Sequence, residues 1–144
     1  MKKNLGTIVA AIIVLLVVFL LSIPFINNHL ASRIATEIEE ISLPEKTIYI
    51  ESLSRADKMV GNGNGIQYLD AVLIKSELSI EELKDFYSEH KELIIEEQTE
   101  QQIEFIDHGE LSFEHSFDEN ENYYIIYSWG NGNELLGALD MRGH

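Results

Sequence analysis

Histidine and acidic side chains gather in the second half of the sequence, where they could hold a metal ion. His108 and His115 stand among Asp107, Glu110 and Glu114. Imidazole and carboxylate groups are common metal ligands. Their spacing matches neither His-Glu-x-x-His nor a two-histidine, one-carboxylate pattern, so we expect no resident metal or other cofactor.

A second candidate for chemistry is an alternation of oxygen ligands. Asp118, Asn120 and Asn122 occupy positions like those of the first three ligands of a calcium loop. Tyr123 stands where such a loop needs glycine, and Trp129 stands where it needs a bidentate glutamate. The pattern therefore predicts a polar turn, with a looser calcium site as the alternative.

Two glycine-asparagine runs could direct backbone N–H groups at an anion. They cover residues 61–65 and 130–133. The first lacks the Gly-Lys-Ser/Thr ending of a nucleotide loop, and it precedes a predicted strand where that loop precedes a helix. Both runs are therefore interpreted as turns, and because both flank strands they could lie near each other.

Nucleophilic catalysis has little support in the sequence. The chain has no cysteine, and no serine lies in a Gly-x-Ser-x-Gly pattern. No carboxylate pair stands out among the many acidic residues. We therefore expect a protein that is not an enzyme, with an anchored hydrolase as the weakest of three functional hypotheses.

The charge of the chain restricts its partners. The formal net charge is -15, and residues 77–121 hold 16 acidic residues against Lys84 and Lys91. Such a surface repels nucleic acid, whose phosphates need lysine and arginine. A solvated acidic face is the favoured interpretation, and a basic protein partner or divalent cations are the alternatives.

The element at the start of the chain is a long apolar segment. Residues 4–32 carry no charge, and 15 of the 19 residues 8–26 are Ile, Val, Leu or Phe. As a helix these 19 residues span about 28 Å, close to the thickness of the hydrocarbon core of a bilayer. Lys2 and Lys3 precede the segment, which predicts a cytoplasmic N-terminus and an extracytoplasmic C-terminal domain. An uncleaved anchor is favoured over a cleaved signal peptide because the apolar run is long and lacks an Ala-x-Ala type site.

An amphipathic stretch follows the predicted span. Leu30, Ile34, Ile38 and Ile41 recur at helical spacing between polar residues. This stripe could pair with another helix, but four positions are few for a coiled coil. The favoured interpretation is a stalk resting on the protein's own outer domain, ending before Pro44.

The remaining residues, 45–144, predict one small α+β domain with an antiparallel sheet and one packed helix. Ser79-Ile-Glu-Glu82 has the form of a capping box at the start of a helix over residues 80–90. The predicted strands cover residues 47–53, 66–75, 93–98, 102–107, 110–117 and 123–129. The last two are expected to pair as a hairpin.

Aromatic residues are concentrated in that predicted hairpin, where most should build the core. Tyr124 and Ile126 would fall on the opposite face of the strand. If no helix covers that face, it is an apolar patch and a candidate partner surface.

The order of these features resembles small single-pass envelope proteins of Gram-positive bacteria. The resemblance rests on the basic start, the apolar span, Leu43-Pro44, the 61–65 run, Leu73 to Ser76 and the helix start at Ser79. It covers residues 1–90 and implies a location in the envelope, with no catalytic residues to transfer.

The sequence thus predicts an anchor over residues 1–27, a juxtamembrane helix and linker over 28–44, and an extracytoplasmic domain over 45–144. The leading hypothesis is a membrane-anchored accessory or sensory subunit that binds another envelope protein. An extracytoplasmic domain that binds a ligand or a divalent cation is the competing hypothesis.

Overall fold

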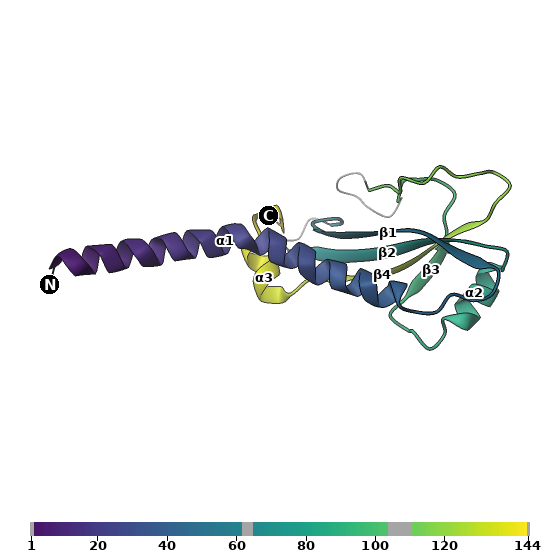
Figure 1. Ribbon diagram of the computed structural model, residues 1–144, viewed down its shortest axis with the longest axis horizontal. Helices are drawn as coiled ribbons and strands as arrows, with labels where there is room; N and C mark the ends of the chain where they lie inside the picture. Colours follow the sequence, from purple (N-terminus) through teal and green to yellow (C-terminus); the bar gives the residue numbers. More distant parts are fainter. Residues whose placement is uncertain (1, 62–64, 104–110, 144) are drawn as a thin grey trace.

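The computed structural model describes residues 2–61, 65–103 and 111–143. One long helix leads into a four-stranded sheet with short helices, which confirms the predicted α+β class (Figure 1). In chain order the elements are α1 (Lys2–Glu39), β1 (Thr47–Asp57), β2 (Gln67–Ser76), α2 (Ile80–Phe86), β3 (Ile94–Glu97), β4 (Tyr123–Asn131), α3 (Glu134–Leu139) and the 3-10 turn η1 (Met141–Gly143).

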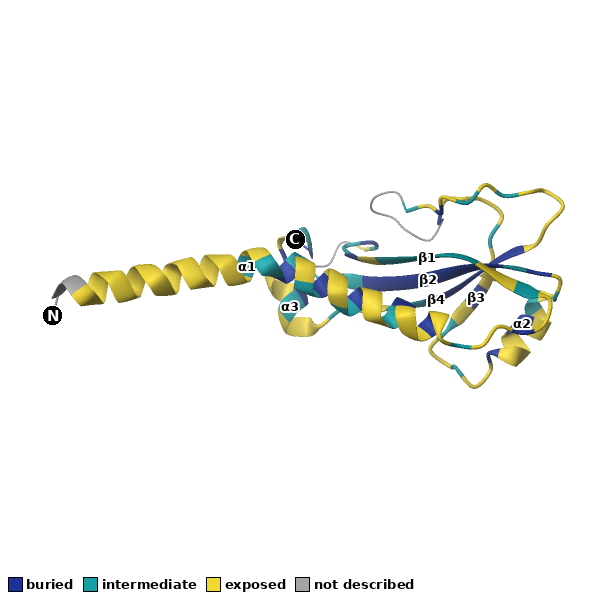
Figure 2. Ribbon diagram, viewed as in Figure 1, coloured by how far each residue is buried: buried dark blue, intermediate teal, exposed yellow. Residues whose placement is uncertain are grey.

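Helix α1 is continuous through the boundary predicted between the span and the juxtamembrane helix. Residues 4–19 are all exposed, whereas the second half of the helix lies along one face of the sheet (Figure 2). Pro24 sits inside the helix without ending it. Among the described residues, α1 is long and apolar enough to cross a membrane, judged by its length and composition.

The sheet has the order β1-β2-β4-β3, and every neighbouring pair is antiparallel. In the centre, Val72 of β2 pairs with Ser52 on one side and Ile126 on the other. Strand β1 carries an irregularity between Tyr49 and Glu51. The two central strands are therefore covered along both edges and form the most buried part of the domain.

Alternating residues of the central strands build two apolar layers, as expected for strands with both faces covered. On one face, Leu69, Leu73 and Ile125 pack with Ile103 and Phe113 from the long connection between β3 and β4. The other face packs against α1 and α2, with buried residues Ile38, Val72, Ile74, Leu83, Tyr87, Ile95, Tyr124 and Ile126.

The predicted hairpin between residues 110–117 and 123–129 is wrong. Strand β4 pairs with β2 and β3, and within residues 111–117 the only ladder contact is an isolated bridge from Ser112 to Gln102. The alternation of apolar residues there reflects Phe113 and its neighbours packing on the sheet face. The strand predicted over residues 102–107 falls largely outside the described residues.

Helix α2 begins as its sequence predicts. Ser79 Oγ accepts a hydrogen bond from the Glu82 backbone, and the Glu82 carboxylate accepts one from the Ser79 N–H at 2.8 Å. The helix is shorter than predicted and ends at Phe86. It packs Leu83 against the same face of the sheet as the second half of α1, at the end of the domain farthest from the N-terminal half of that helix (Figure 1).

Candidate functional site at the helix–domain junction

The inner face of α1 contains small and polar residues as well as aliphatic ones. Ile23, Asn27, Ala31, Ala35 and Ile38 are buried. Spacings of three and four residues place them on one side of a helix. Because two of the five are alanines, α1 can lie close to the sheet, and Ala31 packs with Ala56, Ile66 and Tyr68.

The apolar stripe predicted from the sequence overlaps this inner face at Ile38, and its other members lie beside it. Ile38 is buried in the apolar layer of α2, and Ile41 packs on the same layer just beyond the helix. Leu30 and Ile34 pack on the cluster that contains Ala31. The stripe therefore rests against the protein's own domain, as in the favoured of its two interpretations.

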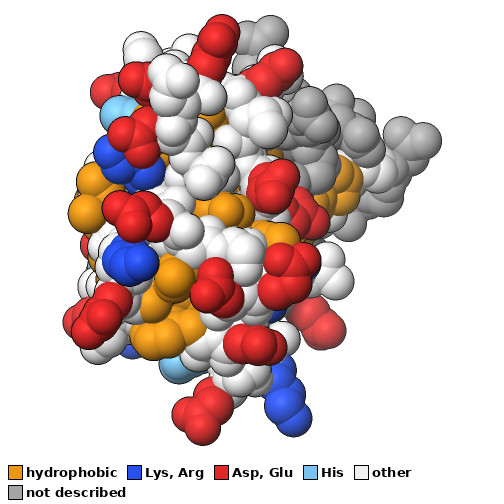
Figure 3. Space-filling view, turned by 90° about the vertical axis from the view of Figure 1, so that its right-hand side faces the viewer, with side chains coloured by type: hydrophobic (Ala, Val, Ile, Leu, Met, Phe, Trp, Pro, Cys, Tyr) orange, Lys and Arg blue, Asp and Glu red, His pale blue; other side chains and the backbone are white. Residues whose placement is uncertain are grey.

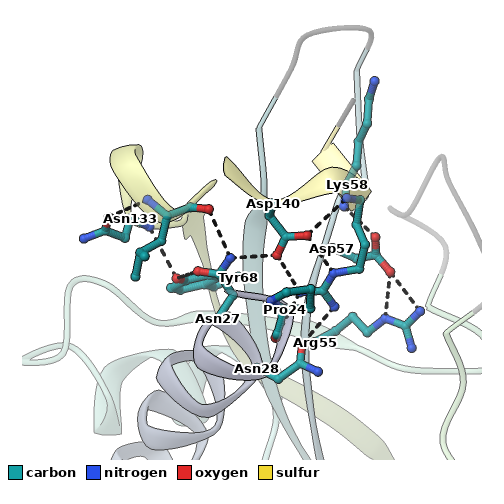
Figure 4. Close-up of polar contacts among 11 residues, drawn as sticks. Pro24, Asn27, Asn28, Arg55, Asp57, Lys58, Tyr68, Asn133 and Asp140 are labelled. Carbon is teal, nitrogen blue, oxygen red and sulfur yellow. Dashed lines mark hydrogen bonds and ion pairs between the residues drawn. The ribbon is translucent and has the colours of Figure 1, made fainter. Parts of the chain in front are cut away.

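A buried polar cluster joins α1 to the end of the chain (Figure 4). Asn27 is fully buried and donates a 2.7 Å hydrogen bond from Nδ2 to Oδ2 of Asp140. The Tyr68 hydroxyl donates to Asn27 Oδ1, also at 2.7 Å. One asparagine thus links the helix, the central strand β2 and the segment after α3.

Arg142 completes this cluster from the exposed side. Its guanidinium donates to both carboxylate oxygens of Asp140, with distances of 3.0 and 2.8 Å, and to the Pro24 carbonyl at 3.1 Å. Burial alone would raise the pKa of Asp140, but hydrogen bonds from Arg142 and Asn27 outweigh burial and lower it. The carboxylate is thereby held charged and fully partnered, which suits a clamp better than an acid catalyst.

A second buried acid lies under α1. Asp70 of β2 is fully buried, and neither carboxylate oxygen has a hydrogen-bond partner among the described residues. Burial is the largest effect and raises its pKa to about 6. The nearby Ser54 side chain and Ala35 backbone oppose this rise, but neither reaches hydrogen-bond geometry with the carboxylate. A charge buried in this way is costly, and buried carboxyl groups with shifted pKa values often mark functional positions.

Gly65, at the end of the first glycine-asparagine run, lies near the second run at this end of the domain; residues 62–64 are outside the described residues. Gln67 pairs with Asn131, and the Gly132 N–H donates to the Ile66 carbonyl at 2.8 Å. Together with the start of α3 they line a hollow of about 550 Å³. Its described lining offers amides and one carboxylate, Glu134, so it has no cation with which to hold a phosphate.

The side chains considered for metal binding have other roles where they are described. His115 lies beside Phe117 and 3.2 Å from the Tyr123 hydroxyl. The Asp118 carboxylate accepts hydrogen bonds from its own turn, from the backbone N and Nδ2 of Asn120, and these lower its pKa. Within residues 2–61, 65–103 and 111–143, no three histidine or acidic side chains could hold a metal ion. His108 lies outside the described residues.

The expectation of a partner face at Tyr124 and Ile126 requires correction. Both side chains are buried, because α1 and α2 cover that face of the sheet. The Tyr124 hydroxyl is also engaged, donating to the Leu78 carbonyl at 2.8 Å. These two residues belong to the core of the domain and do not form an exposed apolar patch.

The surface at the end of the domain farthest from the N-terminal half of α1 is acidic. Viewed along the long axis, this end shows many separate aspartate and glutamate side chains with apolar patches between them (Figure 3). A groove of about 550 Å³ lies at this end, lined by the end of β3, the turn before β4 and the start of β4, including Glu97, Asp118, Glu119, Glu121 and Tyr123. Lys75 forms one ion pair there, with Glu121 at 3.1 Å.

Comparisons with protein-family models, with curated proteins and with solved structures find no match to this chain. Sequence reasoning missed the cluster of Asn27, Tyr68, Asp140 and Arg142, because its members are far apart in the chain. The one local signal was Asn27-Asn28 at the end of an otherwise apolar segment.

Proposed function

We propose that this protein is a single-pass membrane-anchored subunit of the cell envelope, whose outer domain binds another envelope protein in an accessory or sensory role. The observation that carries the proposal is the continuity of α1. Its first half is apolar and exposed, and its second half is part of the core of the domain. An anchor built in this way attaches the domain directly to the membrane-spanning segment, with no flexible linker between them.

The junction supports an uncleaved anchor. Ile23 and Asn27 lie at the end of the apolar segment and are fully buried in the folded domain. Cleavage after the apolar run would cut inside a packed helix and remove Ile23 and the Pro24 carbonyl that binds Arg142. The proposed orientation, with the N-terminus in the cytoplasm, follows from Lys2 and Lys3 before the span.

The acidic end supports a partner of basic character. Glu97 and Glu119 are exposed beside the groove, at the end of the domain farthest from the apolar half of α1. Like charges at this density favour a partner carrying lysine and arginine, which would be attracted over about 10 Å at moderate salt. We infer that the partner contacts this end, which lies well above the membrane.

Crosslinking in intact cells followed by mass spectrometry tests this function. The wild-type chain is compared with a chain whose residues 5–21 are replaced by an unrelated span, since Ile23 must be kept for packing. A third chain carries Glu97→Gln and Glu119→Gln. Its matched control carries Glu37→Gln and Glu40→Gln, which remove the same charge from exposed positions near the end of α1.

The proposal expects one partner, captured equally by the wild-type, span-replaced and control chains and several-fold less by the Glu97 and Glu119 variant. Loss of the partner on replacing the span would place the contact in the membrane and contradict a role for the outer domain. Capture of no partner by any chain would overturn the interaction function. Recovery of the protein in the soluble fraction after alkaline extraction would overturn the anchor itself.

A further inference from the structure

Exposed apolar side chains gather where α1 leaves the domain. Phe25 on α1 is 75% exposed, and Leu135 and Leu139 on α3 are 70% and 38% exposed. Met141, in the turn that follows, is 69% exposed. These four residues, named here the apolar collar, belong to segments at the end of the domain nearest the N-terminal half of α1 (Figure 1).

The polar cluster fixes the height of the collar along α1. The backbone carbonyl of Leu136 lies 3.5 Å from Asn27 Nδ2, and Arg142 binds the Pro24 carbonyl. The chain end is thus held level with residues 24–27 of the helix. Gly143 strengthens this placement, because its carbonyl accepts the Gly65 N–H at 2.9 Å.

That height coincides with the edge of a bilayer. A helix from Leu5 to Pro24 rises about 28 Å, nearly the roughly 30 Å of a hydrocarbon core. The headgroup layer on each side adds about 5 to 7 Å, so a segment bound at residues 24–27 lies within that layer. Side chains exposed to water in an isolated domain would therefore meet lipid there.

The distribution of charge along the domain supports the same orientation. The distal end is densely acidic, whereas charges of both signs lie near the junction. Arg142 pairs with Asp140 and Arg55 pairs with Asp57, while Lys58 follows Asp57 and Glu134 lines the neighbouring hollow. A surface with charges of both signs can approach anionic phospholipids without the repulsion that the acidic end would experience.

We propose that the apolar collar inserts into the outer headgroup layer of the phospholipid bilayer and gives the domain a second membrane contact beside α1. The inference rests on the proposed anchor and goes beyond it, because a span alone would leave the domain free to rock above the surface. With both contacts, the tilt of the domain is set by the lipid surface. The acidic end is thereby directed away from the membrane, toward a partner.

The absence of cysteine allows the collar to be probed one position at a time. Four full-length variants are labelled with a polarity-sensitive fluorophore and reconstituted into vesicles of phosphatidylcholine and phosphatidylglycerol. Leu135→Cys and Met141→Cys report the collar, Ile13→Cys reports the span, and Phe86→Cys reports the distal end. All four side chains are well exposed, so the label does not disturb packing.

Quenching by lipids that carry a nitroxide either near the headgroup or near the end of the acyl chain then measures how deeply each label lies in the bilayer. The proposal expects fluorophores at 135 and 141 to be quenched about twofold more by the shallow nitroxide than by the deep one, as for interfacial side chains. The label at 13 should favour the deep nitroxide, and the label at 86 should be quenched by neither.

The outcomes separate the two proposals. Quenching at 13 without quenching at 135 or 141 overturns the collar and leaves the anchor intact. No quenching at 13 overturns the anchor and, with it, the basis of the collar. Blue-shifted emission at 135 and 141 without lipid quenching would mean that a protein surface covers the collar, and it would also overturn the lipid contact.

Discussion

Asn27 donates a 2.7 Å hydrogen bond from its side-chain amide to Oδ2 of Asp140, joining residues 113 positions apart in a fully buried contact. Asn27 lies where α1 passes from its exposed apolar half to its packed half. Asp140 lies between α3 and the final turn. The contact therefore fixes the direction in which the long helix leaves the domain.

Replacing Asn27 with alanine should destabilise the domain. The change removes hydrogen bonds to Asp140 and Tyr68 and leaves both groups buried with fewer partners, at a cost of about 2 to 4 kcal/mol. Chemical unfolding of the full chain in detergent, followed by the fluorescence of Trp129, measures this. Asn28→Ala is the control, because Asn28 is exposed and binds only the outer side of Arg142. Equal stability of both variants would contradict the importance of the buried cluster.

Two glycines near the junction should respond in opposite ways to alanine. A Cβ at Gly132 would lie 2.7 Å from Cε1 of Tyr68 and 2.9 Å from the Ile66 carbonyl oxygen. The Tyr68 ring and the Ile66 backbone would have to shift to make room, so Gly132→Ala should cost about 1 to 3 kcal/mol.

Gly137→Ala is the matched control for that prediction. Its Cβ would meet Ile66 only at 3.5 Å or more, which is ordinary contact, and Gly137 lies inside α3. Alanine should therefore be neutral or stabilise by about 0.5 to 1 kcal/mol. Thermal unfolding of the two variants measures whether each substitution raises or lowers stability. A destabilised Gly137→Ala would show that α3 packs against Ile66 too tightly to accept a methyl group.

The cap of α2 gives a prediction at the distal end. Ser79→Ala removes the side-chain half of the capping box and should reduce stability by about 1 kcal/mol. Ser88→Ala, at an exposed position beyond the helix, should change stability by less than about 0.5 kcal/mol. Chemical unfolding compares the two, and similar losses would mean that the cap contributes little beyond the packing of Leu83.

The sequence predicted correctly those features of the fold that depend on residues close together in the chain. The Ser79 cap, the apolar run of β2 and the length of the N-terminal span could be predicted because each depends on residues a few positions apart. The continuity of α1 through Pro24 could not be predicted from the sequence. Pro24 removes one backbone donor, and only packing of Ile23 and Asn27 against the domain shows that the helix continues through it.

Strand pairing and the junction depend on contacts between distant segments. The turn at residues 118–122 favoured pairing of β4 with residues 110–117. Instead β4 pairs with β2, and buried Leu73 of β2 packs with its partner Ile125 of β4 on the same face of the sheet. Asp140 and Arg142 looked like ordinary polar residues near a chain end. Their role depends on Asn27, which no short-range pattern connects to them.

The unpartnered Asp70 predicts an unusual dependence of stability on pH. Its pKa rises from 3.8 to about 6 on folding, because burial penalises the charged form. The folded state therefore holds the proton more tightly than the unfolded state. The contribution of Asp70 is fully present below about pH 4 and falls by about 2 to 3 kcal/mol as the pH rises through 6.

Asp70→Asn should remove this dependence, since the amide does not titrate. The free energy of unfolding of the full chain in detergent is measured from pH 4 to pH 8 for both proteins. The difference, variant minus wild type, should increase with pH and level off above about pH 7. Asp85→Asn, which removes a charge from an exposed position of α2, should show no such rise. A flat difference for Asp70→Asn would mean that water or movement of α1 solvates the carboxylate, because only a dry site beneath the helix raises its pKa.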